Sequence, residues 1–487
     1  MQRKLDNVNQ IYSIITEAGT QKQNLADFFL DNRDLALILY LYNNDFFFDD
    51  NDELGSESTS SNDNDDDNDS FSRISVPRED CELLTYADFV LKYMEPNLPV
   101  LFRPSLIEDW KATQAWKIPV SDGEGCNRYD VNFDYLLEHF GHNEVEVHVQ
   151  EAAGFDSIVR PRKISMTVSE YIDLQDNDNN VIHSDEEEEE KVHCYYLKDW
   201  KFLVQNPEHH DAYTCPKYFE DDWLNASMKS AYKFVYLGQA GTSTRLHADV
   251  LSSYSWSTNL VGRKRWHLIP PYYTIFLFDI FGQTLAPHLN YSKDAASTML
   301  YPGLSMARRN AFEIIQEEGE TIFVPSGWYH QVENLESTNS TLSINHNWIN
   351  GYNISWSWQR INRELSRYNE RNASSIKDIS NMDDTAGPTN ESIHGDLLLL
   401  WMMLQNRINE IIEDASEYAF EQNARNNIIM RPGKYMLEHD LRAIQPILQE
   451  LVMLEGKELD FGVSKQCQWS ATDMLSVIEK FLDKYCC

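Results

Sequence analysis

Between residues 232 and 348 the chain has several short runs of aromatic and β-branched residues, some of which alternate bulky and small polar residues with a period of two, and glycine and proline separate the runs. Such alternation is typical of half-buried β-strands, with the Gly and Pro positions marking the turns between them. Many short strands joined by tight turns favour a jelly-roll or double-stranded β-helix barrel, whose mouth can hold a small ligand. The strands predicted in this way are residues 232–239, 254–261, 265–269, 312–316, 321–324, 328–335 and 341–348.

Three candidate metal ligands lie among these strands. His247 and Asp249 form a His-x-Asp tripeptide, and His330 follows 81 residues after Asp249. Two imidazoles and one carboxylate are the ligand set of mononuclear non-haem Fe(II) oxygenases, and the set leaves coordination positions open for a co-substrate and O₂. We therefore interpret His247, Asp249 and His330 as metal ligands and as the catalytic residues.

The tripeptide alone would be a weak signal, because the chain has 14 His residues and many Asp residues. It occurs four times, beginning at His183, His209, His247 and His394. The first copy lies in an acidic run and the second in a polar segment after a proline, while Asp396 of the last copy is predicted to cap the helix that follows. Only the copy at His247 lies between predicted strands, which can hold ligands rigidly.

Lys264 is the candidate cation for an anionic co-substrate. It begins a predicted strand 17 residues beyond His247, and its ammonium would neutralise a carboxylate inside a low-dielectric cavity. Strand alternation should turn the neighbouring Arg263 and Arg265 away from that cavity. The alternative interpretation of the three cations is a solvated basic turn.

The residues around both ligand segments resemble those of the jumonji-C oxygenases. The resemblance is carried by Thr244-x-x-His247-x-Asp249, by residues 262–266 and by residues 319–335, and it covers about residues 76–355. It implies an α+β fold with a double-stranded β-helix (jelly-roll or cupin) catalytic core, flanking helices and an α-helical C-terminal region. It also implies Fe(II), 2-oxoglutarate and O₂ as cofactors, with ascorbate as the reductant in vitro.

The resemblance assigns the three metal ligands to Fe(II) and further residues to the co-substrate. Lys264, Thr244 and Tyr196 would hold a carboxylate of 2-oxoglutarate, and Asn345 and Asn347 would line the pocket near the iron. For Tyr196, an ordinary buried tyrosine with one hydrogen bond is the alternative.

One position departs from the pattern of the family. Related enzymes have an Asn where this chain has Ser257. Asn259 lies two residues further on and therefore on the same strand face, which makes it the candidate replacement in the 2-oxoglutarate pocket.

A narrower resemblance is to the members of the family that hydroxylate a lysine of eukaryotic peptide-chain release factor 1. Residues 196–200, 325–328 and 343–352 carry it. It implies that 2-oxoglutarate and O₂ give succinate and CO₂ while C4 of a lysine is hydroxylated, in translation termination. The alternatives are a jumonji-C histone lysine demethylase and a catalytically inactive binding protein of the same fold. The first would need chromatin-reader spacings that are missing here, and the second has no need of intact His247, Asp249, His330 and Lys264.

The net charge of −37 bears on the partners of the chain. Residues 49–69 and 173–190 contribute 19 of these negative charges, and the remaining surface is still acidic. Such a surface repels nucleic acid, so we expect a protein partner and no direct contact with DNA or RNA. The charge distribution does not predict an oligomeric state.

The expected location is the cytoplasm. No run of about 18 apolar residues would form a transmembrane helix, so no membrane contact is expected, and the first residues lack the apolar core of a secretion signal. The seven Cys residues are scattered without a Cys-x-x-Cys pair, which fits a reducing compartment.

The domain organisation is predicted from changes in charge and hydrophobic periodicity along the chain. Residues 1–45 have helical periodicity, residues 46–75 form an acidic linker expected to be disordered, and residues 76–355 form the oxygenase domain with an acidic loop insertion at 173–191. Residues 356–487 should be a helical region that packs on the barrel or supports dimerisation. The predicted helices from residue 76 onward are 84–93, 129–140, 168–172, 397–418, 435–454 and 471–485, and residues 100–102 are predicted as a strand.

Overall fold

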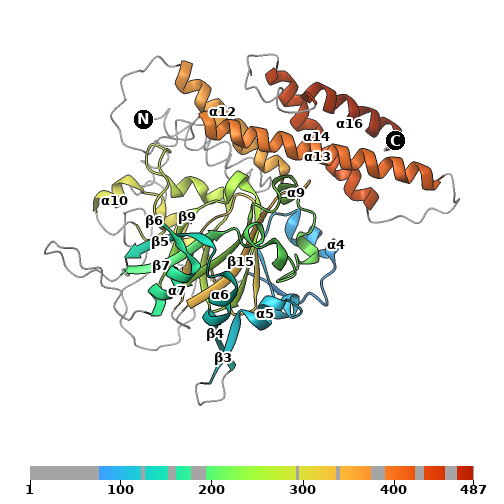
Figure 1. The fold of residues 1–487 in the computed structure, drawn as a ribbon. Helices are drawn as coiled ribbons and strands as arrows, with labels where there is room; N and C mark the ends of the chain where they lie inside the picture. The colour runs from blue at the N-terminus through green and yellow to red at the C-terminus, as the bar shows by residue number, and fades with distance from the viewer. Residues whose placement is uncertain are drawn as a thin grey trace, which may run out of the picture.

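A computed structural model describes residues 76–121, 127–151, 161–176, 193–291, 295–335, 340–373, 390–422, 433–455 and 469–485. The helices expected in residues 1–45, the linker 46–75 and most of the acidic insertion 173–191 lie outside these residues. The described chain forms two large β-sheets and a two-stranded hairpin, with helices around them and a group of long helices at the C-terminal end (Figure 1).

The larger sheet has nine strands in the order β1-β2-β13-β10-β15-β8-β7-β5-β6. Neighbouring strands are antiparallel, except that β1 runs parallel to β2. In chain order the strands are β1 (Arg78–Glu79), β2 (Val100–Phe102), β5 (Glu144–Glu151), β6 (Arg162–Thr167), β7 (His193–Trp200), β8 (Lys233–Gln239), β10 (Tyr254–Val261), β13 (Thr321–Val324) and β15 (Ser340–Trp348).

The smaller sheet has four antiparallel strands in the order β12-β11-β14-β9. They are β9 (Ser243–His247), β11 (Lys264–Ile269), β12 (Phe312–Gln316) and β14 (Tyr329–Asn334). From β9 to β15 the chain passes back and forth between the two sheets, which is how a double-stranded β-helix is built. This arrangement confirms the predicted jelly-roll core. A separate hairpin joins β3 (Lys117–Ser121) to β4 (Asn127–Val131).

The two faces of the larger sheet differ in chemistry. Its outer face carries large aromatic residues such as Trp256 and Phe323, which join the main hydrophobic core with α4 (Tyr86–Phe89), α6 (Phe133–Phe140) and α7 (Val168–Asp176). On the inner face, Ile322 and Val324 of β13 pack against the smaller sheet. The inner residues of β10 and β15 are instead Ser and Asn, so the space between the sheets is filled at one end and polar at the other.

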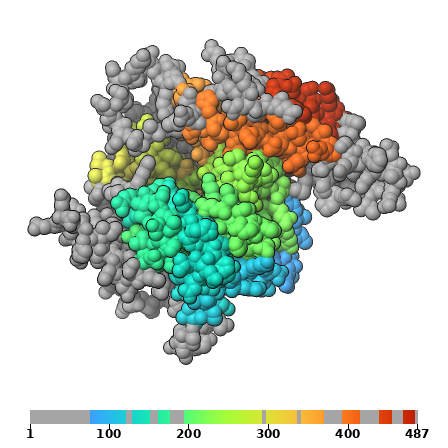
Figure 2. Space-filling model, viewed as in Figure 1, coloured from blue at the N-terminus to red at the C-terminus, as the bar shows by residue number. Residues whose placement is uncertain are grey.

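The C-terminal helices pack together along one side of the barrel (Figures 1 and 2). They are α12 (Ile354–Ala373), α13 (Asn390–Gln422), α14 (Gly433–Glu455) and α16 (Ala471–Tyr485), and they share one buried core with α9 (Trp223–Met228). Residues such as Leu400, Ile444 and Ile478 lie in this core. No helix among the described residues is long and apolar enough to cross a membrane.

Two helical predictions were wrong in detail. Residues 129–131 belong to β4, and the helix begins only after Asn132, whose side chain accepts a hydrogen bond from the backbone N–H of Tyr135. Asp396 lies inside α13 and does not cap it, because the helix already begins at Asn390. The predicted helix 84–93 is a short α4 that continues as a π-helix, η1 (Val90–Met94).

Candidate metal and co-substrate site

The three candidate ligands come together at one end of the smaller sheet. His247 is the last residue of β9 and lies directly opposite His330 of β14 in the antiparallel register. Asp249 follows two residues later, at the start of the 3₁₀ turn η6 (Val250–Ser252). The ligand atoms of the three side chains lie within 4.8 Å of one another, and His247 and Asp249 are only half-buried. The group could therefore hold a metal ion that keeps positions open toward the cavity.

Backbone contacts select the tautomer of both imidazoles. The Nδ1 atom of His247 lies 2.7 Å from the carbonyl oxygen of Arg245, and that of His330 lies 3.0 Å from the carbonyl oxygen of Trp328. A carbonyl can only accept, so Nδ1 donates in both rings, and Nε2 is the ring nitrogen that can bind a metal ion. Burial, together with the neighbouring His330, lowers the pKa of His247 to about 3. The neutral imidazole is the form that binds a metal ion.

The carboxylate ligand is also held in place. The Ser255 hydroxyl donates to Oδ2 of Asp249 at 2.7 Å, which leaves Oδ1 for a metal ion. The backbone carbonyl of Asp249 accepts a hydrogen bond from Arg360 of α12 at 3.1 Å. The C-terminal helical region therefore contacts the loop that carries this ligand.

A second group of metal-ligand residue types is less suited to a cation. Glu146, His148 and Asp199 also gather on the larger sheet. However, the Lys163 ammonium already pairs with Glu146 at 2.7 Å, and Asp199 accepts a hydrogen bond from the Tyr236 hydroxyl at 2.7 Å. We interpret this group as an ion-paired surface of the sheet.

The co-substrate side of the site is a cavity between the two sheets. Lys264 is 2% exposed, and its ammonium donates to the Ser343 hydroxyl at 2.6 Å. Among the described residues no carboxylate pairs with it, and burial and the charge of Lys198 lower the pKa of Lys264 to about 7. A buried ammonium with only a neutral partner is a binding site for an anion. The cavity is lined by Tyr196, Lys198, Tyr236, Thr244, His247, Asp249, Ser255, Trp256, Ser257, Lys264, Trp266, His330, Val332, Asn345, His346 and Asn347.

The two arginines beside Lys264 face outward, as predicted. Arg263 forms an ion pair with Glu317 at 2.7 Å, and Arg265 forms one with Glu333 at 2.9 Å. Of these three neighbouring cations, only Lys264 lines the cavity.

The predicted polar residues surround that ammonium. The Tyr196 hydroxyl is buried, and its side chain is hydrogen-bonded with those of Thr244 and Asn334. Asn345 donates to the Ser343 hydroxyl at 3.0 Å, so that hydroxyl accepts from both Asn345 and Lys264.

Ser257 and Asn347 complete the polar lining. The Ser257 hydroxyl is buried in the cavity wall without a hydrogen-bond partner among the described residues. Asn347 donates its amide to the Ser253 hydroxyl at 3.1 Å. The unsatisfied Ser257 hydroxyl and the cation without a counterion both fit a small anionic ligand with several oxygen atoms.

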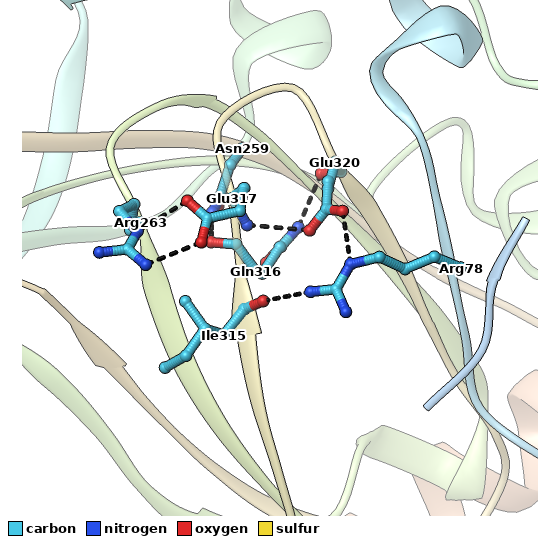
Figure 3. A network of polar contacts seen from close by, with 7 residues as sticks. All are labelled: Arg78, Asn259, Arg263, Ile315, Gln316, Glu317 and Glu320. Carbon is cyan, nitrogen blue, oxygen red and sulfur yellow. Dashed lines mark hydrogen bonds and ion pairs between the residues drawn. The ribbon is translucent and has the colours of Figure 1, made fainter. Parts of the chain in front are cut away.

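Asn259 does not line the cavity, and its expected role is corrected. Its side chain is fully buried and donates to the carbonyl oxygen of Gln316 at 3.2 Å (Figure 3). The β10–β15 register shifts between Asn259 and Val261, where β10 leaves the cavity. Alternation alone placed Asn259 beside Ser257, but its amide belongs to a network at the end of the barrel.

Sequence reasoning missed Lys198, which also lines the cavity. Its position could have been found, because alternation along β7 places Lys198 on the same face as Tyr196.

Comparison of the sequence with known proteins identifies the family of the chain. A model of the cupin-like domain matches residues 86–354. The chain is 37% identical to "2-oxoglutarate and iron-dependent oxygenase JMJD4" of Gallus gallus over 78% of this chain and 86% of that protein. The chain belongs to the cupin-like JmjC family.

Two further relatives share less of their length with this JmjC chain. The human protein of the same name is 37% identical over 59% of this chain and 64% of its own length. "Arginine-specific demethylase JMJ20" of Arabidopsis thaliana is 35% identical, and the match spans 62% of each chain. The chain thus matches less than two thirds of these two relatives.

Proposed function

We propose that the protein is an Fe(II)- and 2-oxoglutarate-dependent oxygenase. The observation that carries this proposal is the meeting, in one cavity, of two imidazoles and a carboxylate with a buried lysine that has no counterion among the described residues. The first set suits Fe(II), and the second suits the distal carboxylate of 2-oxoglutarate. The names of the JMJD4 relatives support the same cofactors.

Each residue has a definite task in this proposal. His247, Asp249 and His330 would hold Fe(II), and Lys264, Thr244 and Tyr196 would orient 2-oxoglutarate. Bound together, Fe(II) and 2-oxoglutarate supply the reduction of O₂ that places one oxygen atom on the target and one in succinate. The buried walls around Lys264 exclude water from the co-substrate, and Asn345 and Asn347 present amide groups to the space above it.

We further propose a protein substrate, namely a lysine of eukaryotic peptide-chain release factor 1 that is hydroxylated at C4. The proposal rests on the resemblance of residues 196–200, 325–328 and 343–352 to the hydroxylases with this target. The strongly acidic chain supports a basic protein segment as the partner and argues against direct nucleic-acid binding. Release factor 1 acts in translation termination, so the proposed location is the cytoplasm.

The test combines mass measurement with a ligand variant. The protein is incubated with Fe(II), ascorbate, 2-oxoglutarate and the N-terminal domain of the release factor, beside a His247→Ala sample. One added oxygen atom on a lysine, absent from the His247→Ala sample, is the expected result. Succinate formation without that mass gain would overturn the substrate and keep the oxygenase. No turnover of 2-oxoglutarate, with or without target, would overturn the oxygenase itself.

Demethylation is the second candidate, because one relative is named as an arginine-specific demethylase. Hydroxylation of an N-methyl group releases formaldehyde, whereas hydroxylation of a side-chain carbon leaves the oxygen on the target. Methylated arginine and lysine peptides are therefore included in the same assay, and formaldehyde release with no mass gain of one oxygen would favour this candidate.

A further inference from the structure

Lys198 is a second cation in the cavity lining, and it is the first residue of a bulge in β7. Leu197 pairs with Leu237 and Trp200 with Val235, so both Lys198 and Asp199 lie opposite the single residue Tyr236. Such bulges re-aim side chains and are common beside active sites. Asp199 takes a left-handed backbone conformation with a φ of 56°.

The two residues of the bulge have separate surroundings. The Asp199 carboxylate is exposed and accepts from the Tyr236 hydroxyl at 2.7 Å. The Lys198 ammonium lies 5.6 Å from the ring centres of both Tyr196 and Tyr236 and lines the cavity. Among the described residues no carboxylate forms an ion pair with Lys198, although Asp199 is its direct neighbour.

The cavity lining carries more positive than negative charge, which favours a ligand with more than one negative charge. The Lys264 ammonium lies 5.9 Å from the Tyr236 ring centre, so both lysines flank the same ring. Asp249 is the only carboxylate in the lining, and a divalent metal ion would add two positive charges. Lys198 lines the same cavity as Lys264 and the metal-ligand group, so its charge faces the space between them.

We propose that Lys198 is a positioning residue of the co-substrate site, whose ammonium pairs with the carboxylate of 2-oxoglutarate next to the keto group while Lys264 pairs with the distal one. This inference rests on the proposed function.

Direct binding to the Mn(II)-loaded full chain tests the assignment without turnover. Calorimetry measures the affinity for 2-oxoglutarate and for 2-oxopentanoate, which keeps the keto acid and lacks the distal carboxylate. Lys198→Met should weaken both ligands by about tenfold to a hundredfold, since a charged hydrogen bond is lost in each. Lys264→Met should weaken 2-oxoglutarate and leave 2-oxopentanoate nearly unchanged. Lys198→Arg keeps the charge and should restore most of the affinity.

Lys163→Met is the matched control, because Lys163 lies on the same sheet but pairs with Glu146 outside the cavity. It should bind both ligands like the wild type. Unchanged binding by Lys198→Met, with a weaker apparent affinity for the protein target, would overturn the inference and place Lys198 at the target. As long as the wild type binds 2-oxoglutarate, that result overturns the role of Lys198 and leaves the proposed function standing. A wild type that binds no 2-oxoglutarate would overturn the proposed function and this inference with it.

Discussion

Gln316 offers the sharpest test of how the barrel supports its site. Its side chain is fully buried and makes three hydrogen bonds, of which Figure 3 shows the one to Glu320. The amide donates to the carbonyl oxygens of Ser257 and Glu320, both at 2.8 Å, and its oxygen accepts from the indole N–H of Trp266 at 2.8 Å. One side chain thus joins β10, β11 and the turn between β12 and β13.

Gln316→Met removes all three bonds while nearly conserving the volume of the side chain. Each such bond contributes about 1 kcal/mol, and the Glu320 carbonyl keeps only its bond from the backbone N–H of Asn259 at 3.1 Å, so we expect the free energy of unfolding to fall by about 3–4 kcal/mol. Trp266 lines the cavity, and its ring centre lies 5.7 Å from that of His330. The variant should therefore also bind 2-oxoglutarate more weakly.

Chemical denaturation followed by tryptophan fluorescence and circular dichroism measures the first effect. Arg263→Met is the control from the same network, since the Arg263–Glu317 pair is largely exposed and worth about 1 kcal/mol or less. The reasoning is refuted if the two variants lose the same stability, or if Gln316→Met unfolds like the wild type.

Three further outcomes follow from the buried charges. Pairing with an anion raises the pKa of Lys264 above its value of about 7, so binding takes up a proton above that pH. Titration calorimetry on the metal-loaded protein should show the affinity for 2-oxoglutarate falling up to about tenfold per pH unit as pH rises above 7, with no such fall in Lys264→Arg. Asp440→Asn removes the buried negative charge that lies 2.7 Å from Arg407 and should lower the free energy of unfolding by about 3–5 kcal/mol in a denaturant titration, whereas the exposed Arg442→Met should have little effect. Gly351→Ala should cost about 1–3 kcal/mol in the same titration, because its Cβ would overlap the Asp440 carboxylate; a neutral result would show that α14 can shift away.

The strands and the metal-ligand group followed from the sequence because both depend on local pattern. Alternation fixed the bounds of β10, β12 and β13, and the His-x-Asp copy at a strand end could be separated from three others by its surroundings. The sheet register that sets His247 opposite His330 is a long-range property, which only the resemblance had implied.

The errors arose where tertiary contacts override alternation. Asn259 follows the period of Ser257, yet Gln316 engages its amide where β10 leaves the cavity. Lys198 is a different case, because alternation along β7 already places it on the face of Tyr196, and it was overlooked because the segment was interpreted through Tyr196 alone. Residues 129–131 have helical periodicity but pair with β3, since a hairpin can satisfy the same backbone groups.

The position of β9 at the edge of the smaller sheet has a consequence for exchange of its amide hydrogens. Among the described strands β9 pairs only with β14, and the register between them is irregular. A metal ion bound by His247 and His330 would link this edge strand to its neighbour, and strands with few partners open most readily without such a link. Loss of the metal should therefore increase deuterium uptake at Thr244 and its neighbours in β9 before the nine-stranded sheet is affected. Since Thr244 also faces the co-substrate cavity, the metal ion would order part of the pocket that 2-oxoglutarate later enters.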